Sequence, residues 1–277
     1  MKLSLTAVFA VVLMTMFSAS EAQAASFRTF VSSTGSSLNT AMNCPRTAPC
    51  RNFSDAYSVT TPGGEIVALD SAGYGSVNIT KSVTITAIPG ECGFVNVVAG
   101  GSGITINAGS SDLVILRNLM IGGAGNANTV GVQHNSGNLI IQNSTFTQLT
   151  TGVSATGAKL DLIDSNLLSN TVAVRADGEG ADTQSFPLVA ATTMIRISGG
   201  NIANNGTAFV MANPGQRPNP ATDNKINIFV RLLGNSAADW SVNLTGNAAV
   251  TSGSGTGCSD PYTCQSIGVY GSTTNPR

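Results

Sequence analysis

The 277-residue chain has very few of the side chains on which most catalytic and nucleic-acid-binding sites depend. It contains one histidine and one tryptophan, and charged residues make up only 10% of it. A single histidine and the lack of any C-x-x-C pair argue against a zinc site. The formal net charge of −1 argues against non-specific nucleic-acid binding, because that binding needs many cations to neutralise phosphates. No Ser–His–Asp set, phosphate-binding loop or nucleotide motif is present.

Long apolar runs are also missing after the first residues. Lys2, the apolar stretch Leu3–Phe17 and an A-x-A site at Ala22–Ala24 predict a secretory signal peptide over residues 1–24. The apolar stretch is short for a membrane-spanning helix. We therefore expect a mature protein without a membrane span, secreted or periplasmic, that forms one domain of about 250 residues.

The five cysteines fit an exported protein. Cys44 and Cys50 enclose one short proline-containing loop, and Cys258 and Cys264 enclose another. Two such C-x5-C loops predict two local disulfides in an oxidising compartment. Cys92 is left over, and we expect it to be a small buried apolar residue.

What the chain has in abundance is a repeated unit of alternating apolar positions. The unit that starts at Leu139 recurs 21 residues later from Leu160 and a further 35 residues later from Ile195. An upstream unit starts at Val114 and carries a short insertion. Such a period is typical of a stacked β-solenoid. The strands are too closely spaced for βαβ units, so we expect them to stack in parallel with about 4.8 Å between rungs.

One column of the repeat is polar and falls where the chain turns from one strand to the next. It contains Asn118, Asn143 and Asp164. Side chains of this kind bond to neighbouring backbone or to one another, so we predict a structural ladder at this bend.

The two ends of the solenoid are expected to be closed. A helix over residues 51–60, capped by Ser54 and stopped by Pro62–Gly64, would cover the first rung and protect its strand edges. We expect residues 25–64 to form this N-terminal cap, residues 65–250 the β-helix, and residues 251–277 a disulfide-closed tail.

Several segments resemble those of a known family, the exported bacterial right-handed parallel β-helix repeat proteins with a pectin-lyase-like fold. The resemblance covers most of residues 27–175 and rests on Thr29–Ser32, Cys44–Cys50, Gly63–Ile66, Gly73–Gly75, Ile79–Ile85 and Leu116–Leu119. It implies an all-β, right-handed parallel β-helix (solenoid) with a short N-terminal capping helix. It implies no activity, because the broader fold includes pectate lyases, polygalacturonases and epimerases as well as phage and adhesin surface modules.

The repeat alignment predicts which side chains point outward. Gln133, Ser154 and Arg175 share an outward column in the second strand of successive units, and they would form the floor of a shallow groove. Two long insertions, residues 177–194 and 212–227, leave the same corner on neighbouring rungs and would wall the groove. Long loops on a rigid scaffold often carry binding residues, so this groove is the predicted substrate-binding site.

A metal-dependent reaction at this groove is the main alternative to simple binding. Asp177, Glu179 and Asp182 could hold Ca²⁺, which prefers several oxygen ligands in flexible geometry. In a lyase of this fold Arg175 would then act as the catalytic base. The spacing matches no EF-hand, and a solvated acidic loop is the simpler reading.

The other titratable groups fit structural roles. An inverting hydrolase needs opposed carboxylates, which Asp161 and Asp177 do not provide. Asp161 and Arg196 lie in one outward column and should pair. His134 lies in an inward column and should be packed in the core.

The leading functional hypothesis is therefore an exported, non-catalytic scaffold that interacts with polysaccharide or the cell surface and needs no cofactor. The first alternative is a small Ca²⁺-dependent polyuronate lyase. The second is an adhesin-like module that self-associates end to end.

Overall fold

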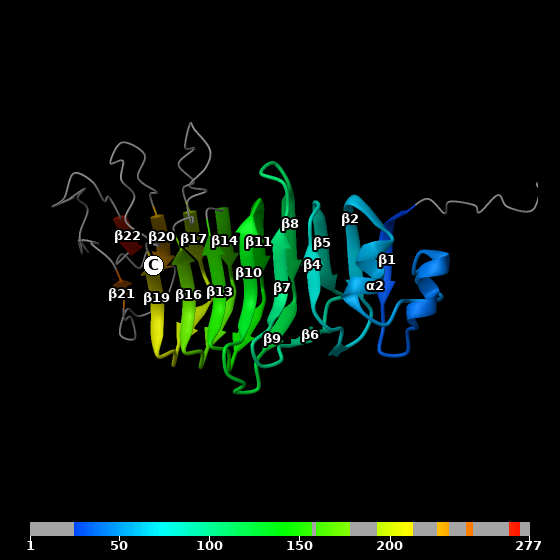
Figure 1. Ribbon diagram of the computed structural model, residues 1–277, viewed down its shortest axis with the longest axis horizontal. Helices are drawn as coiled ribbons and strands as arrows, with labels where there is room; N and C mark the ends of the chain where they lie inside the picture. The colour runs from blue at the N-terminus through cyan, green and yellow to red at the C-terminus, as the bar shows by residue number, and fades with distance from the viewer. Residues whose placement is uncertain are drawn as a thin grey trace, which may run out of the picture.

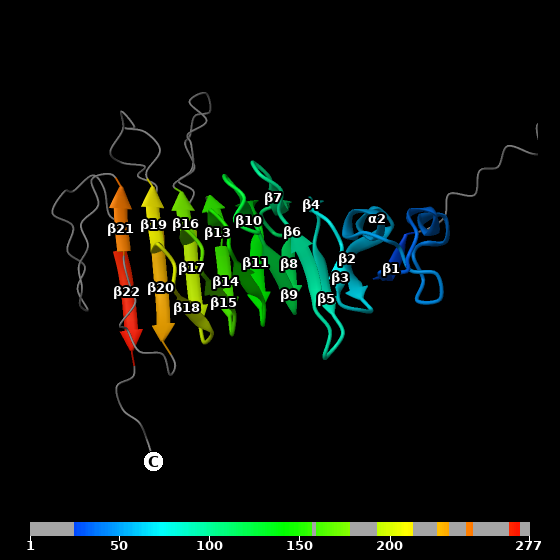
Figure 2. The ribbon, with the colours of Figure 1, turned by 90° about the horizontal axis from the view of Figure 1, so that it is seen from below.

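In the computed structural model of the protein, the described residues are 25–156, 159–177, 193–212, 226–232, 242–245 and 266–271. Their strands form three parallel sheets that wind around one core, so the chain is a parallel β-helix. Figures 1 and 2 show the strands stacked along one long axis, with the N-terminal cap at one end. In the described ranges no helix is long and apolar enough to cross a membrane.

The three sheets are named A, B and C, in the order in which the chain visits them on each full turn. Sheet A consists, in spatial order, of β1 (Ser26–Val31), β2 (Thr60–Ala68), β5 (Val83–Ala87), β8 (Leu113–Arg117), β11 (Asn138–Gln142), β14 (Lys159–Ile163), β17 (Thr193–Ser198), β20 (Ile226–Leu232) and β22 (Ser266–Gly271). Sheet B consists of β3 (Ala72–Gly73), β6 (Gly93–Asn96), β9 (Leu119–Gly122), β12 (Thr145–Thr147), β15 (Asn166–Leu168) and β18 (Asn201–Ala203). Sheet C consists of β4 (Val77–Ile79), β7 (Ser102–Asn107), β10 (Val130–Ser136), β13 (Thr151–Thr156), β16 (Val172–Asp177), β19 (Thr207–Ala212) and β21 (Val242–Thr245).

The pairing register confirms the repeat read from the sequence. Leu139 pairs with Leu160, and Leu160 with Ile195, as the shifts of the repeat require. The stacking also begins earlier than the visible repeat, because Val83 pairs with Val114. Inward residues of all three sheets are buried in one continuous apolar core.

The predicted ladder at the bend between sheets A and B is confirmed for its two asparagines. Both adopt positive φ, 54° at Asn118 and 46° at Asn143. Asn143 Nδ2 donates to Asn118 Oδ1 at 2.7 Å, and Asn118 Nδ2 donates to the Ala87 carbonyl at 3.1 Å. On the next rungs Asp164 (φ 48°) and Gly199 (φ 69°) occupy the same column. A Cβ added at Gly199 would lie 2.0 Å from Asp164 Oδ1, so a larger residue there would displace the Asp164 side chain.

The capping helix is present but shorter than predicted. It is α2 (Phe53–Ser58), and its N-cap residue is Asn52 rather than Ser54. It ends early because β2 already begins at Thr60, whose hydroxyl donates to the Ala56 carbonyl at 2.6 Å. Phe53 and Ala56 are buried, so the helix covers the first rung as expected.

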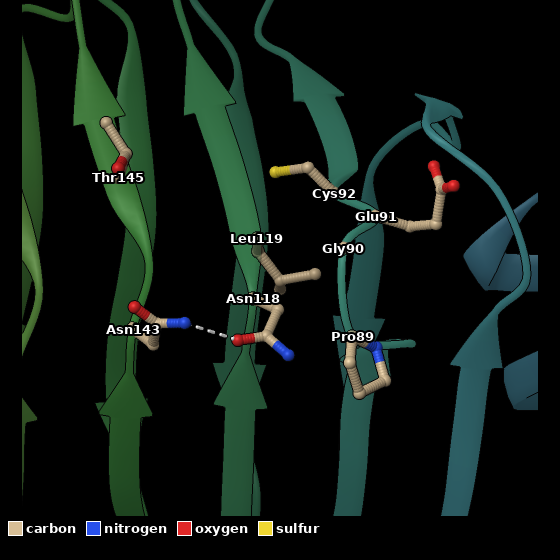
Figure 3. A pocket seen from close by; sticks show the side chains of 8 residues that line it. All are labelled: Pro89, Gly90, Glu91, Cys92, Asn118, Leu119, Asn143 and Thr145. Carbon is tan, nitrogen blue, oxygen red and sulfur yellow. Dashed lines mark hydrogen bonds between the residues drawn. The ribbon is translucent and has the colours of Figure 1, made fainter.

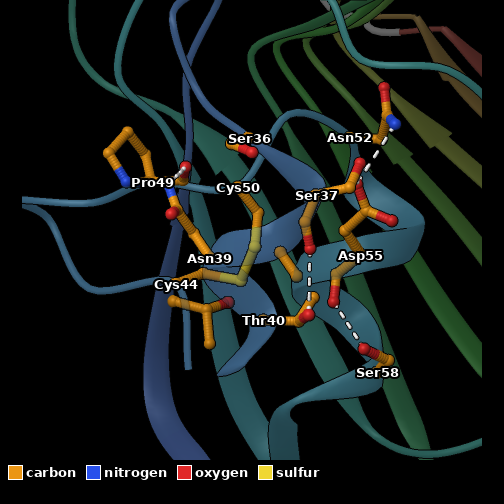
Figure 4. Close-up of a disulfide and its surroundings, with 12 residues drawn as sticks. Ser36, Ser37, Asn39, Thr40, Cys44, Pro49, Cys50, Asn52, Asp55 and Ser58 are labelled. Carbon is orange, nitrogen blue, oxygen red and sulfur yellow. Dashed lines mark hydrogen bonds between the residues drawn. A yellow bond between two sulfur atoms is a disulfide. The ribbon is translucent and has the colours of Figure 1, made fainter. Parts of the chain in front are cut away.

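The disulfide Cys44–Cys50 is confirmed, and its loop covers the outer edge of β1. Phe30 donates its backbone N–H to the Cys44 carbonyl at 2.9 Å and accepts one from Cys50 at 2.8 Å. A 3₁₀ helix, η1 (Ser37–Met42), lies in the same segment (Figure 4). The edge that would otherwise be open to aggregation is thereby paired. The second predicted disulfide, Cys258–Cys264, lies outside the described residues.

The prediction for Cys92 was wrong in one respect. Cys92 is a free thiol but is only half-buried, because it lies in the turn between β5 and β6 rather than on an inward strand position. His134, in contrast, is buried in the core as predicted.

Candidate functional site

The outer face of sheet C brings the predicted groove residues together. In register, Gln133 pairs with Ser154, and Ser154 with Arg175, so the three lie on adjacent strands. Arg175 is exposed and Gln133 half-buried, but Ser154 is only 4% exposed. The short Ser154 side chain lies between the longer side chains of Gln133 and Arg175, so Ser154 offers a ligand less accessible surface than the sequence predicted.

The same face carries a row of side-chain amides that sequence reasoning missed. Asn78, Asn107 and Asn135, on β4, β7 and β10, are all exposed. Asn107 Nδ2 donates to Asn78 Oδ1 at 3.0 Å, and Asn135 Nδ2 donates to Asn107 Oδ1 at 2.8 Å. Gln133 Nε2 donates to Asn135 Oδ1 at 2.9 Å and joins the predicted groove to this row. We call these four residues the amide row.

The amide row retains unused hydrogen-bonding capacity. Each of its three bonds uses one of the two N–H groups of a donor amide, and each carbonyl oxygen has two lone pairs. The exposed groups can therefore both donate to and accept from a ligand. Hydroxyl groups, which also donate and accept, are their natural complement.

The strands that carry the amide row contain no charged side chain. Strands β4, β7, β10 and β13 contain no Asp, Glu, Lys or Arg. The first charged groups along sheet C are Arg175 and Asp177 on β16. A neutral polar ligand bound on the first four strands would therefore bury no charged side chain of these strands. The first cationic side chain on the strands of sheet C is that of Arg175, on β16.

The predicted calcium set is only partly covered by the described residues. Asp177 pairs with Thr156 and Ala212 in sheet C, and it follows Arg175 by two residues on the same strand. Glu179 and Asp182 lie outside the described residues. Within the described ranges no three His, Cys, Asp or Glu side chains come close enough to hold a metal.

The Asp161–Arg196 pair lies on the outer face of sheet A, away from the amide row. Arg196 Nε donates to Asp161 Oδ1 at 2.5 Å, and Nη2 binds the second carboxylate oxygen. The hydrogen bond and the charge of Asp161 raise the pKa of Arg196. The predicted pair is confirmed, and it satisfies both partners without forming a site.

A pocket of about 360 Å³ lies at the bend between sheets A and B (Figure 3). It is lined by the β5–β6 turn, including Glu91 and Cys92, and by Asn118, Asn143 and Thr145 of the following rungs. Glu91 already accepts a hydrogen bond from Ser71 at 2.6 Å. Burial raises the pKa of the Cys92 thiol, so the thiol stays protonated and is a poor nucleophile.

The most strongly shifted pKa values belong to the N-terminal cap and the core. Asp70 is partly buried, which raises its pKa, but hydrogen bonds from Tyr74, Ser33 and Ser32 outweigh this and lower it to about 2. Burial and the neighbouring Asp70 raise the pKa of Tyr74, whose ring lies tilted against that of Phe53 with 5.0 Å between the ring centroids. These contacts join the N-terminal cap to the first rung.

No family model, no curated protein and no solved structure matches the chain.

Proposed function

We propose that this protein is an exported, non-catalytic β-helix scaffold that binds polysaccharide on the outer face of sheet C. The amide row carries the proposal, because it presents donors and acceptors on an uncharged surface of successive rungs. The predicted signal peptide and the Cys44–Cys50 disulfide support an oxidising, extracytoplasmic location.

The rigidity of the scaffold supports binding without chemistry. The strands beneath the row are held by parallel ladders and an apolar core, so a ligand does not have to order its own site. Such a surface favours extended ligands that follow the solenoid axis and contact one rung after another, because the rungs repeat at about 4.8 Å.

Affinity electrophoresis tests the proposal directly. The secreted chain would be run through gels that contain neutral polysaccharides (xylan, mannan or a soluble cellulose derivative) or polygalacturonate. We expect retardation by at least one polysaccharide, and its loss in the double variant Asn107→Ala/Asn135→Ala. The matched control is Asn166→Ala on sheet B. Retention by no polysaccharide, or equal retention of all three proteins, would refute the proposed binding face.

The calcium-dependent polyuronate lyase is the second candidate, because Arg175 and Asp177 lie two residues apart on β16. Elimination would give an unsaturated product with ultraviolet absorbance. A calcium-dependent rise with polygalacturonate that is lost in chelator and in Arg175→Ala would establish this reaction. A flat trace with all polyuronates would exclude it.

End-to-end self-association is a third candidate. The outer edges of β21 and β22, at the C-terminal end of sheets C and A, pair with no strand among the described residues. Sedimentation velocity over a range of protein concentrations distinguishes an adhesin-like assembly from a monomeric scaffold.

A further inference from the structure

His134 is the one buried side chain of the described core whose polar atoms find no partner there. Its exposed fraction is 0%, and neither Nδ1 nor Nε2 has a hydrogen-bond partner of good geometry among the described residues. The backbone of Gly137 and Ser136 interacts weakly with the ring and raises its pKa, but burial outweighs this effect. A buried polar group without a partner costs free energy, and a buried charge costs much more. The imidazole is therefore tolerated only while it is neutral.

The strands around His134 offer no counter-charge. In sheet C it pairs with Ile106 on β7 and Ala155 on β13, and neither strand contains a charged residue. The strands of sheets A and B on the same rungs turn apolar side chains inward, such as Leu139 and Phe146.

The charged groups of these neighbouring rungs face away from the core. They are engaged at the surface: Arg117 donates to Gln142, the Asp112 carboxylate accepts from Ser82, and Asp161 is paired with Arg196. Lys159 is exposed. None of them can compensate an imidazolium inside the coil.

The chain is also irregular at this position. The register between β10 and β7 shifts between His134 and Ser136, so one residue of β10 has no direct partner on β7. A β-bulge interrupts the ladder of backbone hydrogen bonds. Water can reach the imidazole here by breaking fewer bonds than in a regular rung.

We propose that His134 makes the middle of the solenoid acid-sensitive: the imidazole can take up a proton only when water reaches it, so falling pH opens the coil at β10 while the N-terminal rungs stay closed. The disulfide loop and α2 hold those first rungs independently of His134.

The direction of the effect follows from the burial of the ring. Burial lowers the pKa of His134 from 6.5 to about 4, so the open form binds the proton more readily than the closed form. The closed form is therefore most stable relative to the open form above pH 6.5, where the ring is neutral in both. This stability is lost as the pH falls towards 4. With these pKa values the opening equilibrium constant rises ~30-fold between pH 8 and pH 5.

Hydrogen–deuterium exchange of the full chain at pH 8 and pH 5, corrected for the intrinsic pH dependence of exchange, measures this opening. We expect protection in Val130–Ser136 to fall ~30-fold at pH 5 relative to pH 8, with a much smaller change in β1 and β2. In His134→Leu the difference should disappear. His134→Met serves the same purpose if the leucine variant does not fold.

Ile106→Val is the matched control, since it loosens the same inward column but keeps the imidazole. It should lower protection at both pH values and retain the ~30-fold pH difference. Equal pH dependence in the wild type and in both His134 variants would overturn the proposal. So would a loss in β1 and β2 as large as that in β10.

Discussion

Asparagine side chains stack on neighbouring rungs in two regions of this molecule, and they serve different purposes. At the corners between sheets they bond to one another and also to backbone: Asn118 bonds to Ala87, Asn170 to Phe146, and Asn205 to Leu167. On the outer face of sheet C, the hydrogen bonds of the amide row run only from side chain to side chain. The corner amides bond to backbone groups that lose their backbone partner at the turn. The three hydrogen bonds of the amide row involve no backbone group. Residue type alone therefore does not show whether an amide is structural or available to a ligand; its hydrogen-bond partner does, because structural amides bond to backbone.

The largest effect is expected at the corner between sheets B and C. Asn170 is 3% exposed; it accepts from the Leu149 N–H at 3.1 Å and donates to the Phe146 carbonyl at 3.1 Å. Asn170→Ala leaves both backbone groups buried without partners, so we expect the free energy of unfolding to fall by about 3 kcal/mol. Urea unfolding followed by circular dichroism measures it. A loss below about 0.5 kcal/mol, the range of ordinary surface substitutions, would contradict the structural role.

A smaller loss in the free energy of unfolding is expected at the corner between sheets A and B, where two substitutions of Asn143 control for each other. Asn143→Ala removes the bond to Asn118 and replaces Asn, which tolerates positive φ, by Ala, which tolerates it poorly, at φ 46°; this should cost about 2 kcal/mol. Asn143→Gly removes the same bond but accepts the positive φ, so it should cost only about half as much. If the two variants unfold at the same urea concentration, backbone strain is not part of the role of Asn143.

The ion pair on sheet A should matter least among the paired groups. The side chain of Arg196 is 65% exposed, so solvent screens its attraction to Asp161. Asp161→Asn is expected to change the free energy of unfolding by less than about 0.5 kcal/mol, and by less still at high salt. A loss above about 1 kcal/mol in the same urea titration would show that the pair does more than satisfy its own charges.

The inward columns and the corner ladder could be predicted because each depends on spacing within one repeat. A side-chain period of two residues puts Leu139, Leu160 and Ile195 on one inward column without knowledge of the whole coil. The ladder of Asn118 and Asn143 at the bend was predicted from the same repeat alignment. The inward position of His134, which the structure confirms, was predicted from it as well.

The amide row as a whole could not be predicted in this way, although Gln133 was part of the predicted groove. Asn78 and Asn107 lie on rungs upstream of the recognisable repeat, and their bond joins residues 29 positions apart. The β-bulge after His134 then shifts Asn135 relative to β7. The exposure of Cys92 was mispredicted for a related reason, because the β5–β6 turn is longer than the bends of one or two residues on the later rungs. Irregular turns change exposure without changing the apolar pattern.

The most direct test of the central claim compares a corner variant with a face variant by two measurements on the same proteins. Asn170→Ala at the corner and Asn107→Ala/Asn135→Ala on the face are each assayed for urea stability and for retardation by the polysaccharide that retains the wild type. The account predicts that the corner variant loses stability and keeps binding at temperatures where it is folded. The face variant should lose binding and stay within about 0.5 kcal/mol of the wild-type stability. A face variant that binds like the wild type, or that loses binding only because it unfolds, would contradict the account.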